Sequence, residues 1–333
     1  MINTGIAIAG SGSATPSVSV DNHALSQLVE TSDEWIASRT GIRYRKLASA
    51  ETTLSAIATR AAQQALSMAQ VDPSEIDLIL LATSTADDLF GSAGQVQAQL
   101  GATQAVAFDL TAACSGFVFG LVTAAQFIRT GVYRNVLLIG ADVMSRWVDW
   151  SDRTTCVLFG DGAGAVVLQA SECDRLLGFE LRSDGNQNAC LNLSYQPQPK
   201  ALTDQITIGQ GNYQSVTMNG QEVYRFAVTK VPEVIEKALY RANMGAEGID
   251  WLILHQANQR IMDAVAQRLN IPAEKVISNL ANYGNTSAAS IPLALDEAVR
   301  EGKIQPGDVI AVSGFGAGLS WGASIFQWGK PSS

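Results

Sequence analysis

The feature that most constrains the fold of this chain is the repetition of one structural plan in its two halves. Residues 61–85 combine a helical stretch, a short loop and the apolar run Ile76–Leu80, and residues 234–258 repeat that plan around Ile249–Leu254. The two apolar runs are offset by 249 − 76 = 173 residues. Self-similarity at a fixed spacing is the signature of repeated architecture, so the sequence predicts a duplicated α/β fold.

A second pair of motifs keeps nearly the same spacing. A helical stretch that ends at Gly131 precedes the apolar run Val136–Ile139, and another that ends at Gly302 precedes Val309–Val312. The offset of this pair is 302 − 131 = 171 residues, close to that of the first pair. The agreement between two independent pairs supports the duplication.

Two glycine-rich segments, Gly160–Gly164 and Gly314–Gly318, come next in each half. Their offset is only 314 − 160 = 154, so the first half carries about 171 − 154 = 17 extra residues before its glycine segment. A dinucleotide site needs such glycines between a strand and a helix. Here the strand-like runs Ala165–Leu168 and Ser324–Trp328 follow, so we expect tight connections between strands.

The coarse pattern alternates apolar strand-like runs with alanine-rich helical stretches. Strands are expected at Ile6–Gly10, Ile76–Ala82 and Val136–Gly140, and helices at Thr53–Met68 and Gln95–Leu100. This alternation predicts mainly parallel sheets covered by helices on both faces. We assign the N-terminal half to residues 1–172 and the C-terminal half to residues 173–333.

Composition excludes several classes of function. Of 333 residues, 47% are hydrophobic and 16% are charged, which suits a large core and a buried subunit interface. The net charge of 22 − 31 = −9 argues against nucleic-acid binding. No apolar run is long enough to cross a bilayer and no basic segment precedes an apolar stretch at the N-terminus, so membrane insertion and secretion are not expected.

The cysteines and histidines are few. Four scattered cysteines are too sparse for a disulfide scaffold and lack the paired spacing of a zinc site, so we expect a reduced cytoplasmic protein without a metal. His23 and His255 are the only histidines. A mechanism that needs two catalytic histidines would therefore have to use both of them.

Cys114 is the strongest candidate for a catalytic residue. It lies in Asp109–Phe117, which leads from an expected strand into a helix that ends near Thr130. At a helix start, unpaired N–H groups and the helix dipole favour the thiolate form. A free cysteine is more often an inert small hydrophobe, but the small neighbours of Cys114 leave room for a thioester substrate.

His255 and Asn285 are the next candidates. His255 ends the repeated apolar run, and strand ends are where ligands bind in open α/β sheets. Asn285 lies in Asn282–Ser290, a segment rich in small and polar residues. Taken singly, a structural histidine and a turn or N-cap asparagine are the ordinary alternatives.

In combination these motifs resemble the β-ketoacyl-acyl carrier protein synthase III family, the initiating condensing enzymes of fatty-acid synthesis. The resemblance runs essentially from end to end with the motifs in order. It rests on Thr40–Arg43, the Cys114 segment, Phe159–Gly164, His255–Asn258, Gly284–Ser290 and Gly314–Gly316. It implies an α/β fold of the thiolase-like duplicated αβαβα type, a homodimer, and no cofactor, since the coenzyme A thioester is a substrate.

The resemblance also implies a reaction in two steps. Cys114 takes an acyl group, with acetyl expected, from an acyl-CoA substrate. Malonyl-acyl carrier protein then loses carbon dioxide, and its carbanion attacks the thioester while His255 and Asn285 stabilise enolate charge. The N–H groups of Cys114 and Ala317 match the oxyanion hole, although many relatives have glycine at the second position. Phe315 matches a residue that promotes decarboxylation.

Binding positions carry over from the resemblance in the same way. Trp35 and Arg153 match the pair that sandwiches the adenine, and Gly220 and Asn258 match positions along the pantetheine tunnel. Phe90 matches the residue that reaches across the dimer to bound the acyl pocket. Ordinary core packing is the alternative for the two aromatic residues. The full coenzyme A set is Thr31, Trp35, Arg39, Arg153, Gly220 and Asn258.

Acyl carrier protein is the implied partner, and it is acidic like this chain. Recognition then requires a local positive patch, which a Debye length of about 8 Å permits. Arg268 lies 268 − 260 = 8 residues beyond Arg260, on roughly the same helix face, and Arg225 could flank the same entrance. The carrier contacts implied by the family are Gln256, Ala257, Asn258, Gln259 and Arg260.

Other functions fit less well. A type III polyketide synthase shares the Cys–His–Asn set and a Gly-Phe-Gly loop, and it is the main alternative, but such enzymes are usually longer and need no carrier protein. Papain-like hydrolases order their residues as Cys, His, Asn, but they place the cysteine near the mature N-terminus and are generally disulfide-bonded. The starter acyl length stays open, because the pocket volume depends on packing across the dimer.

Overall fold

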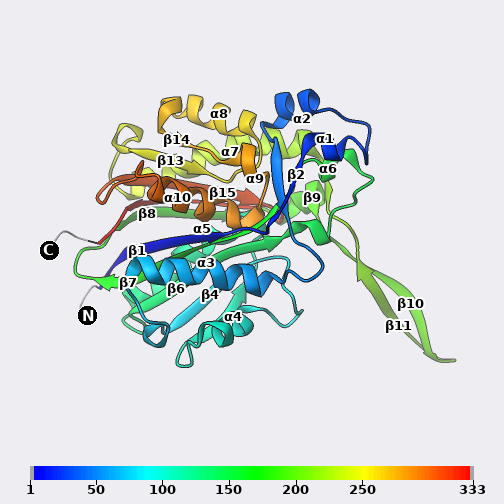
Figure 1. Ribbon diagram of the computed structural model, residues 1–333, viewed down its shortest axis with the longest axis horizontal. Helices are drawn as coiled ribbons and strands as arrows, with labels where there is room; N and C mark the ends of the chain where they lie inside the picture. Colours follow the sequence, from blue (N-terminus) through cyan, green and yellow to red (C-terminus); the bar gives the residue numbers. More distant parts are fainter. Residues whose placement is uncertain (1–3, 331–333) are drawn as a thin grey trace.

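The computed structural model describes residues 4–330 and contains two five-stranded sheets (Figure 1). The first has the order β1-β7-β6-β4-β5. β4 pairs in parallel with β5 and β6, whereas β7 pairs antiparallel with β1 and β6. The strands are β1 (Gly5–Ala14), β4 (Leu78–Ala82), β5 (Val106–Leu110), β6 (Asn135–Val143) and β7 (Asp161–Ser171).

The second sheet repeats this plan with the order β14-β13-β15-β16-β8. Its strands are β8 (Leu176–Ser183), β13 (Trp251–Leu254), β14 (Val276–Ile277), β15 (Val309–Gly316) and β16 (Ser320–Gln327). β13 pairs in parallel with β14 and β15, whereas β16 pairs antiparallel with β15 and β8. Four of the five strands in each sheet run in the same direction and only β7 or β16 runs against them, so the expected mainly parallel sheets each contain one antiparallel strand. The short return of residues 317–319 allows only antiparallel pairing of β15 with β16.

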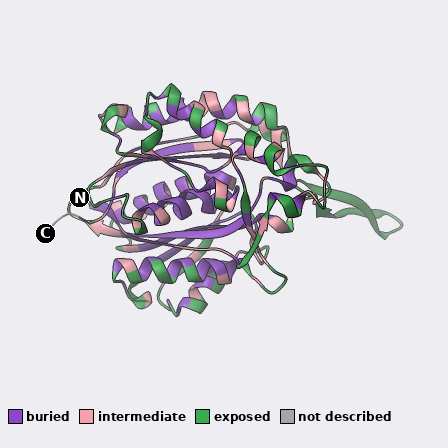
Figure 2. Cartoon of the chain, turned by 45° about the horizontal axis from the view of Figure 1, so that its top comes forward, coloured by how far each residue is buried: buried purple, intermediate pink, exposed green. Residues whose placement is uncertain are grey.

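Helices form three layers around the two sheets, so the order of layers is αβαβα (Figures 1 and 2). α5 (Gly116–Arg129) and α10 (Ser290–Arg300) lie between the sheets. α3 (Leu54–Ala69) and α4 (Ala93–Leu100) cover the first sheet, and α7 (Gly220–Arg241) and α8 (Gln259–Arg268) cover the second. α5 is buried on most of its circumference because sheets flank it on two sides. The predicted duplicated fold is confirmed.

The two glycine segments differ in their settings. Gly314–Gly318 leads from β15 into β16, as the sequence predicts. In the first half, however, Gly162 and Gly164 lie inside β7 rather than in a tight turn. A Cβ on Gly164 would lie 2.6 Å from the backbone nitrogen of Leu293, so this glycine lets α10 approach the strand closely.

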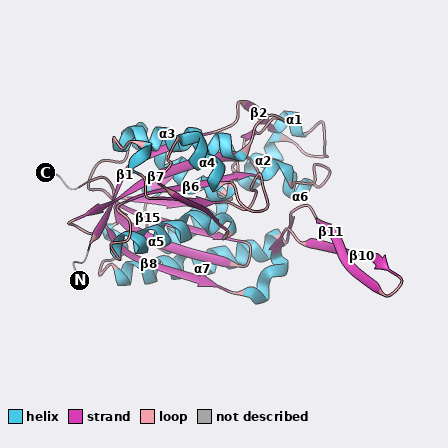
Figure 3. Ribbon diagram, turned by 90° about the horizontal axis from the view of Figure 1, so that it is seen from below, coloured by secondary structure: helices cyan, strands magenta, loops and turns pink. Residues whose placement is uncertain are grey.

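Shorter elements complete the chain. They are β2 (Val18–Asp21), α1 (Asn22–Leu25), α2 (Asp33–Thr40), β3 (Tyr44–Leu47), α6 (Arg153–Cys156), β9 (Leu191–Asn192), β12 (Thr217–Met218), α9 (Leu280–Tyr283), and the 3₁₀ turns η1 (Pro73–Glu75), η2 (Ala113–Ser115), η3 (Met144–Arg146), η4 (Gly185–Cys190), η5 (Ala246–Gly248), η6 (Ala273–Lys275) and η7 (Ser287–Ala289). A hairpin of β10 (Tyr195–Thr203) and β11 (Ile206–Tyr213) projects from the body of the molecule (Figure 3). Among the described residues, no helix has both the length and the apolar character needed to span a membrane.

Candidate active site

Cys114 lies in the turn that joins β5 to the central helix α5. The turn is η2, and its first residue, Ala113, has a φ of 46°, in the left-handed region that few residues other than glycine adopt. No side chain caps the start of α5, so backbone N–H groups remain available beside Cys114. The predicted position of Cys114 at a helix start is confirmed.

Its predicted ionisation is wrong for this structure. Burial raises the pKa of Cys114 to about 12, a hydrogen bond from Ser287 opposes that effect, and the negative charge of Asp142 adds to it. The thiol is therefore protonated in the resting chain. The loss of hydration depends on packing that a linear motif does not contain.

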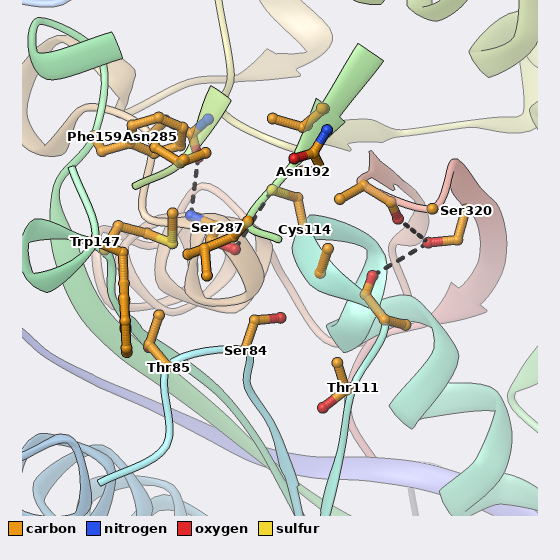
Figure 4. A pocket seen from close by; sticks show the side chains of 18 of the residues that line it. Ser84, Thr85, Thr111, Cys114, Trp147, Phe159, Asn192, Asn285, Ser287 and Ser320 are labelled. Carbon is orange, nitrogen blue, oxygen red and sulfur yellow. Dashed lines mark hydrogen bonds between the residues drawn. The ribbon is translucent and has the colours of Figure 1, made fainter. Parts of the chain in front are cut away.

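Ser287 contacts Cys114 directly. Its Oγ donates a hydrogen bond to Cys114 Sγ at 3.4 Å, and its backbone N–H donates to Asn285 Oδ1 at 2.9 Å (Figure 4). Like Ala113, Ser287 begins a 3₁₀ turn with a positive φ, here 52°. Ser287 lies within the motif Gly284–Ser290, but no local pattern marks its hydroxyl, because the contact joins residues 173 positions apart.

His255 follows β13, as predicted, and is buried. Its Nδ1 lies 2.7 Å from Ser290 Oγ, which also accepts the N–H of Gln256 at 3.3 Å. The Ser290 hydroxyl can also donate its proton to Nδ1, and in that tautomer Nε2 carries the N–H. Burial lowers the pKa of His255 to about 3, so the ring is neutral.

Asn285 is fixed by backbone and side-chain bonds. Its backbone forms a parallel bridge with Phe159. In this bridge, the N–H of Gly160 donates to Asn285 O at 2.9 Å, and the N–H of Asn285 donates to Leu158 O at 2.8 Å. Because Asn285 Oδ1 accepts from Ser287, its amide NH₂ is the group left to donate to a substrate.

The turn after β15 closes the site on another side. The ring of Phe315 packs edge-on against His255, with 5.4 Å between ring centroids. A Cβ on Gly316 would lie 2.7 Å from Cys114 N, so only glycine allows this approach. The approach places Gly316, the residue before Ala317, against the backbone of Cys114.

One cavity of about 2330 Å³ joins these groups. It extends from Trp35 and Arg39 past Cys114 to Phe90, and Asn285 also lines it. Figure 4 shows Ser287 between Asn285 and Cys114 in its wall. Between residues 4 and 330, no cluster of three or more His, Cys, Asp or Glu side chains is placed to hold a metal ion.

At one end of the cavity, two guanidinium groups flank an indole ring. Those of Arg39 and Arg153 lie 4.9 Å and 5.0 Å from the centroid of Trp35. Trp35 is only partly buried, so it is not an ordinary core residue. Arg153 also donates to Glu30 O at 2.8 Å, and the buried hydroxyl of Thr31 makes no hydrogen bond with the described residues. Neither Thr31 nor Arg153 lines the cavity.

The tunnel residues Gly220 and Asn258 both line the cavity. Asn258 also joins two elements, because its Oδ1 accepts from Arg260 N at 2.9 Å and its Nδ2 donates to Arg39 O at 3.1 Å. These bonds cap α8 and hold it against α2.

The expected carrier-protein contacts divide into accessible and inaccessible residues. Gln256 is fully buried and binds Leu254 O and Asn279 N through its side chain, so its prediction as a contact is wrong. Its side chain turns inward and accepts the N–H of Asn279, the residue that precedes α9. Gln259 and Ala257 are partly exposed, and Ala257 lines the cavity.

The three arginines lie at different distances from the cavity. Arg260 and Arg225 line it, and Arg260 stacks over Tyr224 at 5.8 Å from the ring centroid. Arg268, at the far end of α8, donates to Val228 O at 3.4 Å and does not line the cavity.

Phe90 lies on the surface at the other end of the cavity. Its side chain is 99% exposed, which rules out core packing. The adjacent edge strand β5 exposes Val106 and Phe108 at 50% and 39%. This apolar edge has no partner strand among the described residues.

Asp142, at the end of β6, was not anticipated from the sequence. Its Oδ1 accepts three hydrogen bonds, from Thr83 Oγ1 at 3.1 Å, Ser84 N at 2.9 Å and Thr85 Oγ1 at 2.8 Å. Its Oδ2 accepts one, from Ala288 N at 3.1 Å. Burial raises the pKa of Asp142, and hydrogen bonds to its carboxylate only partly oppose that effect.

Comparison with known proteins gives a consistent result. Residues 108–185 match the family described as 3-oxoacyl-[acyl-carrier-protein] synthase III, and residues 239–328 match its C-terminal family. The chain is 72% identical over 330 residues to the beta-ketoacyl-[acyl-carrier-protein] synthase III of Trichormus variabilis, covering 99% of this chain and 100% of that protein.

Solved structures agree with the sequence matches. The crystal structure of 3-oxoacyl-[acyl-carrier-protein] synthase III from Aquifex aeolicus VF5 matches with a TM-score of 0.90 and 44% identity, covering 97% of this chain and 100% of that one. The priming beta-ketosynthase of the R1128 polyketide pathway matches with a TM-score of 0.90 and 33% identity, covering 99% and 98%. The duplicated fold is therefore thiolase-like.

Proposed function

The chain belongs to the 3-oxoacyl-[acyl-carrier-protein] synthase III family, and from that premise we propose that Cys114, His255 and Asn285 are its catalytic residues. It is a condensing acyltransferase that initiates fatty-acid synthesis. The observation that carries the assignment of the residues is their convergence on one cavity. Two of them come from the C-terminal half and one from the N-terminal half, so the duplicated fold builds the site from both.

In the first step, Cys114 takes an acyl group from acyl-CoA. The sulfur attacks the thioester carbonyl, coenzyme A leaves, and the developing oxyanion is held by the backbone N–H groups of Cys114 and Ala317. The close approach at Gly316 supports this pairing. A backbone donor is retained when alanine replaces the glycine found in many relatives.

In the second step, malonyl-acyl carrier protein loses carbon dioxide and its enolate attacks the acyl-enzyme. Nε2–H of neutral His255 and the NH₂ of Asn285 donate to the thioester oxygen as negative charge develops. The bonds that take His255 Nδ1 and Asn285 Oδ1 support these roles, because each leaves only a donor for the substrate. The products are 3-oxoacyl-acyl carrier protein and carbon dioxide. Phe315 packs on His255 and shields this region from water.

The nucleotide of coenzyme A is assigned to the end of the cavity at Trp35. Arg39 and Arg153 already stack on that ring, so an adenine would displace one guanidinium and take its place on the indole face. Thr31 and Arg39 would serve the phosphates, and Gly220 and Asn258 would flank the pantetheine arm.

A homodimer is proposed because the acyl end of the cavity is open in a single chain. Phe90 is almost fully exposed beside the unpaired edge of β5. An edge strand with exposed apolar side chains favours pairing with a second copy, which would also place Phe90 against the partner. The cytoplasm is the proposed compartment, supported by four free cysteines.

The test of this function is intact-protein mass spectrometry after incubation with a panel of acyl-CoA substrates. One acyl group should add to the wild type and none to a variant that lacks Cys114. Addition of malonyl-acyl carrier protein should then remove the group. Release with malonyl-CoA alone, in repeated rounds, would favour a type III polyketide synthase instead.

Arg260 and Arg225, with Arg268 farther along α8, are proposed to bind the acidic carrier protein. The variant Arg260→Glu with Arg268→Glu should weaken use of malonyl-acyl carrier protein and reduce its salt dependence. Acetyl transfer from acetyl-CoA should change little. Unchanged kinetics with the carrier across a salt titration would contradict the assignment.

A further inference from the structure

Two serine hydroxyls meet between the turns that carry Cys114 and Ala317. Ser115 Oγ lies 2.8 Å from Ser320 Oγ, and this contact joins residues 205 positions apart. Ser115 is completely buried where α5 begins, whereas Ser320 begins β16 and lines the cavity. The two proposed steps of the reaction use neither hydroxyl.

Both hydroxyls also contact backbone carbonyls of these turns (Figure 4). Ser115 Oγ lies 2.6 Å from Ala112 O, and Ser320 Oγ lies 3.1 Å from Ala317 O and 3.3 Å from Ala112 O. Because each hydroxyl has one proton and can accept as well, Ser320 can donate to Ser115 while Ser115 donates to Ala112 O. In the opposite order, Ser115 donates to Ser320 and Ser320 donates to Ala317 O. Either order joins the return of residues 317–319 to the turn η2.

The turn and the return that these hydroxyls join are each held by backbone hydrogen bonds of their own. In η2, Ala113 has a φ of 46°, a conformation that persists only where its surroundings hold it. Ala112 O accepts the N–H of Ser115 at 3.1 Å across this residue. In the return, Leu319 exchanges two backbone bonds with Asp184, at 2.8 Å and 2.9 Å. The serine pair adds side-chain hydrogen bonds between the two segments.

The end of β15 packs directly against η2. A Cβ on Gly316 would lie 2.7 Å from Cys114 N, and a Cβ on Gly314 would lie 3.1 Å from Ser115 Cα. A shift of either backbone therefore changes the separation between the N–H groups of Cys114 and Ala317, which are assigned to the oxyanion hole. A misplacement of about 1 Å at a catalytic group can slow a reaction about 10²-fold.

We propose that Ser115 and Ser320 are positioning residues that set the separation of the two N–H groups of the oxyanion hole. This inference rests on the proposed function, which assigns those groups to Cys114 and Ala317. Removal of one oxyanion-hole donor typically slows a reaction about 10²–10³-fold. Loss of the serine link keeps both donors and only loosens their spacing, so the expected loss is smaller, about tenfold.

The experiment is single-turnover acetylation of Cys114 by acetyl-CoA, followed by intact-protein mass spectrometry. Ser320→Ala and Ser115→Ala should each lower the rate at saturating acetyl-CoA about tenfold. The acetyl-CoA concentration that gives half of this rate should change little, because the nucleotide is assigned to the distant end of the cavity. The double variant should be no slower than the slower single variant, since both hydroxyls belong to one chain of hydrogen bonds. Wild-type rates in both single variants, or losses that multiply in the double variant, would overturn the proposal.

Alkylation of Cys114 by iodoacetamide separates positioning of the oxyanion hole from a general disturbance of the site. The sulfur displaces iodide from a saturated carbon in this reaction, so no oxyanion forms. Ser320→Ala and Ser115→Ala should therefore be alkylated at the wild-type rate although they are acetylated slowly. A parallel fall of both rates in a folded variant would overturn the proposal, because the hydroxyls would then act on the thiol or on the fold.

Two further variants provide matched controls. Ser320→Thr keeps the hydroxyl on a residue type that suits a strand, so its acetylation rate should stay close to that of the wild type. Ser313 Oγ donates to Gly322 O at 2.8 Å, so Ser313→Ala removes another hydroxyl bond from the pair of β15 and β16 and should leave acetylation unchanged. A loss in either control as large as that in Ser320→Ala would overturn the proposal. Failure of the wild type to take any acyl group from an acyl-CoA panel would instead contradict the proposed function.

Discussion

The turns that begin the two central helices are structural equivalents with different chemistry. η2 leads into α5 and η7 leads into α10, each is a three-residue 3₁₀ turn, and each begins with a residue at positive φ, Ala113 at 46° and Ser287 at 52°. Their separation of 287 − 113 = 174 residues matches the repeat of 173 found in the sequence. The duplication therefore extends to the backbone of the active site.

The difference between the turns shows that the two halves of a duplicated fold contribute different side chains to one site. The residue after Ala113 is Cys114, the proposed nucleophile, whereas the residue after Ser287 is Ala288, which donates its N–H to Asp142. In the second turn, the group that contacts Cys114 is the hydroxyl at the preceding position, Ser287. The same backbone thus presents a thiol from one half and the hydroxyl that contacts it from the other. Equivalent geometry does not imply equivalent function.

The largest effect is expected when the first turn loses its thiol. Cys114→Ser should abolish formation of the acyl-enzyme, because a hydroxyl has far less tendency to ionise than a thiol. Intact mass after incubation with acetyl-CoA measures this, and circular dichroism checks that the fold is kept. An acyl adduct formed at the wild-type rate would show that another residue is the nucleophile.

The residues of the C-terminal half should affect the other step. His255→Ala and Asn285→Ala should each slow condensation about 10²–10³-fold, because each removes one donor to the enolate oxygen. Transfer of labelled acetyl onto the protein should fall much less. Release of carbon dioxide from the malonyl thioester measures the second step, and an equal loss in both assays would contradict the division of roles.

The two halves also differ in the direction of their pKa shifts. Burial raises the pKa of Cys114 to about 12 and lowers that of His255 to about 3, so the resting site holds a thiol and a neutral ring rather than an ion pair. In the free enzyme, alkylation of Cys114 by iodoacetamide should rise about tenfold per pH unit above neutrality. A plateau beginning near pH 7 would indicate a thiolate and contradict the burial argument.

The smallest effect concerns backbone strain in the first turn. Ala113→Gly should raise the free energy of unfolding by about 1 kcal/mol, because glycine adopts a positive φ without the steric cost that alanine bears. Urea denaturation measures the change, and Ser287→Gly is the comparison from the second turn. A loss of stability in Ala113→Gly would show that the methyl group contributes more through packing than the strained φ costs.

The sequence by itself determined the duplicated α/β plan and the positions of three catalytic candidates. These features are local or periodic: apolar runs at a fixed offset, and Cys114, His255 and Asn285 within short motifs at strand ends and helix starts. They were readable because strand and helix patterns and motif order follow from neighbouring residues alone. The one antiparallel strand of each sheet could not be read in this way, because its direction depends on how the chain returns between strands.

The tertiary structure decided the chemistry around those candidates. Ser287 meets Cys114 across 173 residues and Ala288 meets Asp142 across 146, so no local pattern marks either contact. The protonated state of the thiol and the neutral state of His255 follow from burial between two sheets, and the inaccessibility of Gln256 follows from its inward bonds. Desolvation and long-range hydrogen bonds arise from the packing of distant segments, and they exist only once the chain has folded.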